Sequence, residues 1–177
     1  MKTEKFNYDL PEHLIAQYPS SKRTDSKLLV AIESIQHQVF TDIAKHINKG
    51  DLLILNKTSV IPARLFGEKS TGGKIEILLE RFLSHHQTLT QIKSSRAPRE
   101  GAELVFSFQG NRFIATVKGR QDNFFILDWS DDPKPLFEQY GQIPLPPYMN
   151  RAAEKLDEER YETIYADPNQ KASVFTG

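Results

Sequence analysis

The pattern of apolar and polar positions changes near residue 66 of this 177-residue chain. Before that residue, helix signals alternate with apolar strand signals, and a similar mixture returns towards the C-terminal end. Between the two mixed regions, short strand-like runs follow one another without a helical pattern. An all-β region bracketed in this way is expected when one domain is inserted into another.

The first mixed region predicts two short helices and two strands. "DLPEHLIAQYP" begins with an Asp cap and has Pro11 at the first helical position, which predicts about two turns of helix ending before Pro19. "SKLLVAI" predicts a strand. In "FTDIAKHINKGDLLILN", Thr41 or Asp42 caps a helix that ends at Gly50, and "DLLILN" predicts a buried strand.

The all-β region contains five closely spaced strand-like runs, "GKIEILLERFL", "QTLTQIKSS", "AELVFSF", "RFIATVKG" and "NFFILDW". Turn signals separate them, such as Gln109-Gly110-Asn111 and Gln121-Asp122-Asn123. This spacing predicts a small antiparallel barrel or a sandwich. After it, "PLFEQYGQ" predicts a short helix, "IPLPPYM" a stiff extended segment and "AEKLDEERYETIY" a charged helix.

Composition narrows the possible classes of protein. The chain has no cysteine, which excludes disulfides, thiolate nucleophiles and cysteine metal sites, and fits a reducing setting. Lys plus Arg and Asp plus Glu both total 23, so any attraction to nucleic acid or membrane would come from local patches. No apolar run approaches the roughly 20 residues of a membrane span and no signal-peptide core is present, which predicts a soluble, intracellular protein.

Two candidate sites lie in segments that bracket the all-β region. "LNKTSVIPARL" places hydrogen-bond donors after a predicted strand, where mixed folds bind ligands, and Arg64 could hold a carboxylate or phosphate. The alternative is a turn with a surface arginine. "IPLPPY" is either a rigid linker or a brace that presents Tyr148 to a base or ring.

Two further clusters are charged. The basic run "KSSRAPR" carries Lys93, Arg96 and Arg99. It could follow a phosphate backbone or form a solvated loop. The run "DEERYETIY" could supply acid or base groups through Glu159 and Glu162, or form a charged helix face. No residue spacing fits a metal site, and neither a phosphate-binding glycine loop nor a GxSxG elbow is present.

Five segments in order give the chain a resemblance to a known family. They are "FNYDLPEHLIAQYP", "DLLILNKTSVIPARLFG", "GGKIEILL", "YGQIPLPPYMNR" and "DEERYETIYA". Together they span residues 5 to about 166 and resemble the S-adenosylmethionine:tRNA ribosyltransferase-isomerases of queuosine biosynthesis. The chain departs from the family pattern at Lys57, Ser59 and Glu162 within these segments, and at Lys27 after "TDS".

The resemblance implies an α/β domain with an inserted small antiparallel β-barrel domain. We expect the first α/β segment to span residues 1–65, the barrel 66–140 and the second α/β segment 141–177. The implied reaction transfers and isomerises the ribosyl part of S-adenosylmethionine onto 7-aminomethyl-7-deazaguanine at the tRNA wobble position, giving epoxyqueuosine. S-adenosylmethionine is then a substrate and no cofactor is held permanently. We expect tRNA as partner, a cytoplasmic location and a monomer.

The resemblance also implies site residues, although it assigns no catalytic base. The residues expected to bind substrate or S-adenosylmethionine are Asn56, Thr58, Arg64, Tyr148, Arg160, Tyr161, Thr163 and Tyr165. The residues expected to bind RNA are Lys93, Arg96 and Arg99. By hypothesis, arginines hold a carboxylate or phosphate and a tyrosine stacks on a base.

The family continues beyond the point where this chain stops, at Gly177. We therefore expect the α/β domain to be incomplete here, with exposed apolar surface and little or no ribosyltransferase activity in this chain alone. Two alternatives from other classes remain: a module that binds tRNA or single-stranded nucleic acid without chemistry, and an inert fragment.

Overall fold

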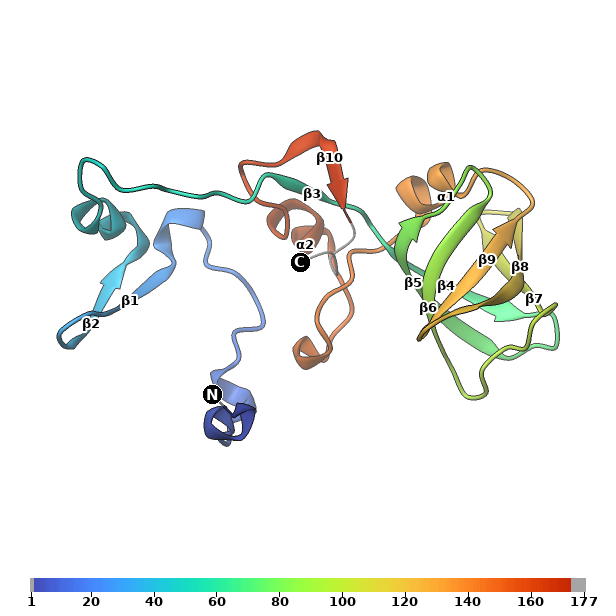
Figure 1. Cartoon of the computed structure of the whole chain (residues 1–177), viewed down its shortest axis with the longest axis horizontal. Coiled ribbons are helices and arrows are strands. Elements are labelled where there is room, and N and C mark those ends of the chain that lie inside the picture. Colours follow the sequence, from blue (N-terminus) through green and yellow to red (C-terminus); the bar gives the residue numbers. More distant parts are fainter. Residues whose placement is uncertain (1, 173–177) are drawn as a thin grey trace. The chain divides into compact units, whose positions relative to one another are not determined.

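The computed structural model of the chain describes residues 2–172, apart from some side chains near its C-terminal end (Figure 1). It divides into two compact units, Met1–Ile54 and Leu55–Gly177. The second unit holds the whole barrel, and all the buried residues of the described chain belong to it.

The barrel has six strands: β4 (Arg64–Lys69), β5 (Lys74–Phe82), β6 (Gln87–Ser94), β7 (Glu103–Phe108), β8 (Asn111–Gln121) and β9 (Phe124–Trp129). They close in the order β4-β5-β6-β9-β8-β7, and every neighbouring pair is antiparallel (Figure 1). The predicted barrel is therefore confirmed, and the sandwich alternative is wrong. The predicted count of five strands is also wrong, because β4 starts with a charged residue and contains Gly67, which hides its alternation.

Alternating side chains fill the barrel with aliphatic and aromatic residues. The Phe106 and Trp129 ring centroids lie 5.1 Å apart, and the Trp129 Nε1–H donates to the Thr88 hydroxyl at 2.9 Å. Helix α1 (Pro133–Tyr140) adds Leu136 and Phe137 to this core, and its first turn is capped by the Asp132 carboxylate, which accepts from Lys134 N–H. The predicted short helix at this position is confirmed.

The predicted turn signals sit where the barrel needs them. Gln109 and Gly110 join β7 to β8 in a two-residue turn, with φ of 50° and 85°. Positive φ at both positions is the backbone of a tight hairpin turn, which glycine adopts without strain. Asp122, with φ of 53°, plays the same part between β8 and β9.

The barrel is inserted between two strands that pair with each other. Strand β3 (Thr58–Val60) precedes it, strand β10 (Asp167–Ala172) follows it, and the two run parallel (Figure 1). Helix α2 (Lys155–Arg160) leads towards β10, and the Asp167 N–H donates to the Lys57 carbonyl at 2.7 Å. Parallel strands joined by a long crossover are the α/β element that the sequence predicted around the barrel.

The first unit is built from local elements. It has the antiparallel hairpin β1 (Lys27–Ala31) and β2 (Ile35–Val39), and four 3-10 helices, η1 (Thr3–Phe6), η2 (Glu12–Leu14), η3 (Arg23–Asp25) and η4 (Phe40–His46). The strand predicted from "SKLLVAI" is confirmed as β1. No residue of this unit is buried among the residues described, 2–54.

Four predictions of regular structure are wrong or too long. The helix expected after Pro11 is only η2, and the helix expected at Thr41 is the 3-10 helix η4, because neither packs an apolar face against a core. The helix expected over "AEKLDEERYETIY" is only α2, which ends at Arg160. Residues 51–57 form no strand, since no neighbouring strand pairs with them in the part of the chain that is described.

Candidate functional site

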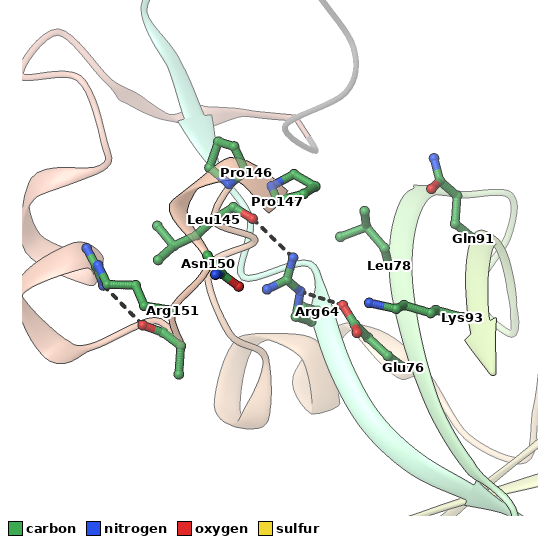
Figure 2. Close-up of a pocket in the computed structure, with 11 residues that line it drawn as sticks. Arg64, Glu76, Leu78, Gln91, Lys93, Leu145, Pro146, Pro147, Asn150 and Arg151 are labelled. Carbon is green, nitrogen blue, oxygen red and sulfur yellow. Dashed lines mark hydrogen bonds and ion pairs between the residues drawn. The ribbon is translucent and has the colours of Figure 1, made fainter. Parts of the chain in front are cut away.

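A pocket of the second unit has a volume of about 670 Å³. Its walls come from the outer face of β4, β5 and β6 and from the proline-rich segment after α1 (Figure 2). The lining residues are Arg64, Glu76, Leu78, Gln91, Lys93, Leu145, Pro146, Pro147, Asn150, Arg151 and Ala152.

Arg64 stands at the centre of this pocket because of the strand alternation. Its neighbours Ala63 and Leu65 are buried in the barrel core, so the Arg64 side chain points outward. The backbone of Arg64 also pairs with Gln142 through two hydrogen bonds, at 3.1 and 2.9 Å. This bridge fixes the proline-rich segment against the start of β4.

The Arg64 guanidinium is held from two sides (Figure 2). Its Nη2–H donates to the Leu145 carbonyl at 3.2 Å, and its Nε lies 3.0 Å from the Glu76 carboxylate. The buried Nε–H is not directed at an acceptor, so the contact with Glu76 is an ion pair rather than an aligned hydrogen bond. Within the described residues, the remaining nitrogen, Nη1, donates to no protein atom.

Lys93 adds a second cation to the same pocket. It lies directly opposite Glu76 in the register of β5 and β6 and extends towards Arg64 and Glu76 (Figure 2). No hydrogen bond or ion pair ties its ammonium group to the described part of the chain. Since Glu76 balances Arg64, the charge of Lys93 is uncompensated, and the pocket attracts an anion.

Two contacts show how closely the proline-rich segment approaches the barrel. Ile143, Pro144 and Leu145 are buried, whereas Pro147 and Tyr148 are exposed and begin the 3-10 helix η5 (Pro147–Met149). At Gly141, a Cβ atom would overlap the carbonyl oxygens of Pro62 and Phe137. Only glycine, which has no Cβ atom, allows the two backbones to come this close. The proline-rich segment is therefore tightly packed against the barrel where it reaches the pocket.

A second arginine, Arg151, is fixed by a bidentate ion pair. Its Nη1 and Nη2 donate to the two oxygens of Asp157 at 2.6 and 2.7 Å. The Asp157 carboxylate also accepts from Glu154 N–H at 2.8 Å. The bond from Arg151 and that from the Glu154 backbone keep the pKa of the Asp157 carboxyl below its ordinary value of 3.8, against the opposing effect of burial. The pair joins the pocket wall to the start of α2.

Tyr161 lies within electrostatic reach of both Arg64 and Tyr148. Burial raises the pKa of the Tyr161 hydroxyl, and the Tyr148 hydroxyl adds to this shift, while the Arg64 guanidinium opposes it. Tyr161 is half-buried and Tyr148 exposed. The structure therefore brings three of the predicted site residues, Arg64, Tyr148 and Tyr161, into one neighbourhood, together with Lys93 from the predicted RNA-binding set.

Other predicted site residues have structural tasks or lie apart from the pocket. Asn56 Oδ1 accepts from Thr58 N–H at 2.9 Å, which shapes the turn before β3. Thr163 Oγ1 accepts from Tyr165 N–H at 3.3 Å, in the turn after α2. Arg160, at the end of α2, is half-buried. None of these five residues lines the pocket, as far as the described chain goes.

Glu162 and Ser59, two of the departures from the family pattern, belong to or contact strand β3. Glu162 accepts from Val60 N–H at 3.2 Å, and Ser59 is buried within β3. Glu159 is exposed on α2. Glu162 thus stabilises the strand that leads into the barrel.

The predicted basic cluster separates into two parts. Lys93 belongs to the pocket, while Arg96 and Arg99 are exposed in the loop between β6 and β7. The Arg96 carbonyl accepts from Lys69 Nζ and from Ser94 Oγ, each at 2.9 Å, so the loop backbone is held. Both loop guanidinium groups face solvent.

Glu76 and Arg151 are the charged pocket residues that were not predicted as site residues from the sequence. Glu76 looks like an ordinary outward position in "GGKIEILL", and its closeness to Arg64 depends on the register of β4 and β5. The turn "STGG" carries a signal for this neighbourhood. Counting residues outward from the turn along both strands of the hairpin pairs Phe66 with Glu76. Arg151 was visible only as part of "PPYMNR".

Two kinds of feature are absent from residues 2–172, a metal-binding cluster and a membrane-spanning helix. No group of three or more histidine, aspartate or glutamate side chains is arranged to hold a metal ion there. Within the same residues, no helix combines the length and apolar character needed to cross a membrane.

Comparison with known proteins gives consistent matches over almost the whole chain. The model of a family described as "Queuosine biosynthesis protein" matches residues 3–176. A protein of Acinetobacter baylyi is 45% identical over 177 residues, and one of Acinetobacter baumannii (strain AYE) is 44% identical over 176 residues. Both are called S-adenosylmethionine:tRNA ribosyltransferase-isomerase.

The matched relatives are longer than this chain. The two matches cover 98% of the chain, but 51% of the A. baylyi protein and 50% of the A. baumannii protein. The chain therefore spans about half the length of these curated relatives. A crystal structure of S-adenosylmethionine tRNA ribosyltransferase from Thermotoga maritima is 31% identical, with a TM-score of 0.40, covering 88% of this chain and 53% of that one.

Proposed function

This chain belongs to the queuosine biosynthesis protein family, and on that premise we propose that it is the substrate-binding part of a tRNA-modifying transferase. The proposed reaction transfers and isomerises the ribosyl part of S-adenosylmethionine onto 7-aminomethyl-7-deazaguanine at the wobble position of tRNA. S-adenosylmethionine is then a substrate, and tRNA is the macromolecular partner. A tRNA substrate places the reaction in the cytoplasm.

One observation carries the assignment of the site: Arg64 and Lys93 both present nitrogen atoms to one pocket without a protein acceptor among residues 2–172. A carboxylate or phosphate is the natural ligand of two such cations. The methionine carboxylate and the RNA backbone each offer one. Glu76 and the Leu145 carbonyl act as positioning groups, because they fix the guanidinium so that Nη1 faces the pocket.

The proposed chemistry needs a dry and rigid site. In this reaction a base removes a proton beside the sulfonium, adenine departs, the amine of the modified base captures the sugar, and methionine leaves as the carbon–sulfur bond breaks. Water would intercept the reactive intermediate, so the enzyme has to exclude it and to hold two substrates in register. The stiff proline segment, clamped to β4 by the Arg64–Gln142 bridge, supplies such a fixed wall.

A second function is supported by a separate observation, the exposed Arg96 and Arg99 on a loop whose backbone is held. We infer that this loop contacts the phosphate backbone of tRNA. A chain that binds tRNA in this way without catalysis would act as an RNA-binding module.

A single incubation experiment distinguishes the transferase from the RNA-binding module. The chain is incubated with S-adenosylmethionine and tRNA that carries the precursor base, and adenine release is followed by chromatography. Release supports the transferase. Salt-dependent tRNA binding without release supports the binding module, and neither result in a folded chain contradicts both.

Matched variants test the pocket. Arg64→Ala should weaken S-adenosylmethionine or tRNA binding about tenfold or more, since a charged hydrogen bond to an anion is lost. Arg112→Ala removes an exposed arginine from β8, outside the pocket, and should change nothing. Equal affinities for Arg64→Ala and the unaltered chain in equilibrium dialysis would remove Arg64 from the site.

A further inference from the structure

Beside the pocket, the outer surface of the barrel has a second hollow that nothing above assigns. Its volume is about 480 Å³. It lies between β4 and β7, which pair over only two residue positions. The residues around it are Phe66, Gly67, Glu68, Lys74, Ile75, Val105 and Ser107.

Phe66 is the unusual member of this set. Its side chain is 47% exposed, although it lies in the middle of a strand whose neighbouring positions are buried or half-buried. No other aromatic ring in the described residues stacks on it. The exposed ring therefore offers an apolar, flat surface at the edge of the hollow.

The register of the barrel joins this hollow to the pocket. Phe66 pairs directly with Glu76, which lines the pocket, and Lys93 is the next partner across on β6. Arg64 is two residues before Phe66 on the same face of β4, about 7 Å away. On the other side of Phe66, Lys74 lines the hollow. The ring is therefore flanked by cations in both directions along the outer face.

We propose that Phe66 is a stacking platform for a base of single-stranded RNA whose phosphates reach Arg64 and Lys93 on one side and Lys74 on the other. This inference rests on the proposed function, because it places part of the tRNA partner on the barrel. Aromatic rings interleaved with cations are how proteins hold unpaired nucleotides, since every base has a face that can stack.

An RNA strand fits this surface better than an apolar protein face does. A protein partner that covered Phe66 would also cover Glu68 and Lys74, which are outward neighbours in the register, and would have to desolvate both charges. A base covers only the ring, and leaves the charged groups to phosphates and water. Among the residues that line the two hollows, the cations Arg64, Lys74 and Lys93 outnumber the carboxylates Glu68 and Glu76, and Arg151 is already paired with Asp157, which favours the same partner.

Three variants of the 177-residue chain test the platform. The probe is a short fluorescently labelled single-stranded RNA of mixed sequence, and binding is followed by anisotropy at low salt. Phe66→Ala should weaken binding about tenfold, while Phe66→Trp should bind as tightly as the unaltered chain or more tightly. Phe40→Ala is the matched control, because Phe40 is 46% exposed but lies outside the barrel, and it should have no effect.

A second measurement uses Phe66→Trp as its own reporter. The chain has a single tryptophan, Trp129, which is buried and bonded to Thr88. RNA should therefore quench the fluorescence of the new surface tryptophan and leave that of the unaltered chain unchanged. An RNA probe with abasic sites should bind without this quenching.

Each outcome decides the question. If the unaltered chain binds RNA and Phe66→Ala binds it equally, the platform is overturned while the proposed function stands. If the folded, unaltered chain binds no RNA, the tRNA partner of the proposed function fails and the platform with it. If Phe66→Ala leaves RNA binding intact but changes the oligomeric state in sedimentation, the surface is an interface between copies and the inference is wrong.

Discussion

The barrel and the first 54 residues use apolar side chains in opposite ways. In the barrel, alternate residues of six strands turn inward and bury one another, including Leu104, Phe106 and Leu127, which are fully buried. In residues 2–54 no side chain is buried, and Leu52 and Ile54 are 84% and 83% exposed. Both regions contain apolar strand-like runs, so hydrophobicity alone does not separate them.

The two regions differ in where along the chain the strands that pair with each run are found. Each barrel strand meets its partners within the same stretch of chain, through short hairpins and two longer-range pairings, β6 with β9 and β4 with β7. A closed sheet needs no further element to cover its inner face. The run at residues 52–55 has no strand beside it in the described structure, so its side chains stay in water. This agrees with the expected exposure of apolar surface outside the barrel.

The largest expected effect on the free energy of unfolding comes from a pair of leucine substitutions, one in each region. Leu127→Ala removes a fully buried side chain and should lower the free energy of unfolding by about 2–5 kcal/mol. Leu52→Ala makes the same change at an exposed position and should stay within about 0.5 kcal/mol. Denaturant unfolding followed by the fluorescence of Trp129 measures both. Equal losses would mean that Leu52 is packed after all.

A smaller effect is expected from two ion pairs, one in each compact unit. Asp157→Asn leaves Arg151 without its bidentate partner in a buried setting and should cost about 3 kcal/mol. Asp42→Asn disturbs an exposed pair with Lys45 and should leave the unfolding curve where it is.

The same pair predicts a dependence on pH. The pKa of Asp157 lies below its ordinary value of 3.8 in the folded protein, so its stabilising effect is complete above that pH. As pH falls below 3.8 and through the lowered pKa, the carboxylate takes up a proton and the effect is lost. Unfolding of Asp157→Asn over this range should therefore vary less with pH than that of the unaltered chain. An identical pH profile would contradict the assigned ion pair.

The smallest expected effect concerns the clamp between the proline segment and the barrel. Gly141→Ala forces a Cβ atom against the carbonyl groups of Pro62 and Phe137 and should cost about 1–3 kcal/mol. It should also weaken ligand binding at Arg64, because the bridge to Gln142 shifts. At Gly73 a new Cβ meets only the flexible Lys69 side chain, so Gly73→Ala is the control. Similar losses for the two variants would remove the special role of Gly141.

Several features of the molecule were determined by the sequence alone. The turn at Gln109 and Gly110, the helix after Asp132 and the strand alternation of the barrel depend on neighbouring residues, and the structure has them. The insertion of the barrel was also predictable, because the pattern changes before and after it. The division into residues 1–65, 66–140 and 141–177 stays a prediction, as do the roles given to individual site residues.

Other features were decided only by the tertiary structure. The sequence does not show that Glu76 meets Arg64 or that Lys93 is left unpaired, because both depend on how three strands are registered. The same limit explains why "DLLILN" predicts a buried strand that residues 51–57 do not form. Local patterns specify what a segment can become, whereas burial and pairing depend on partners that lie far away in the chain.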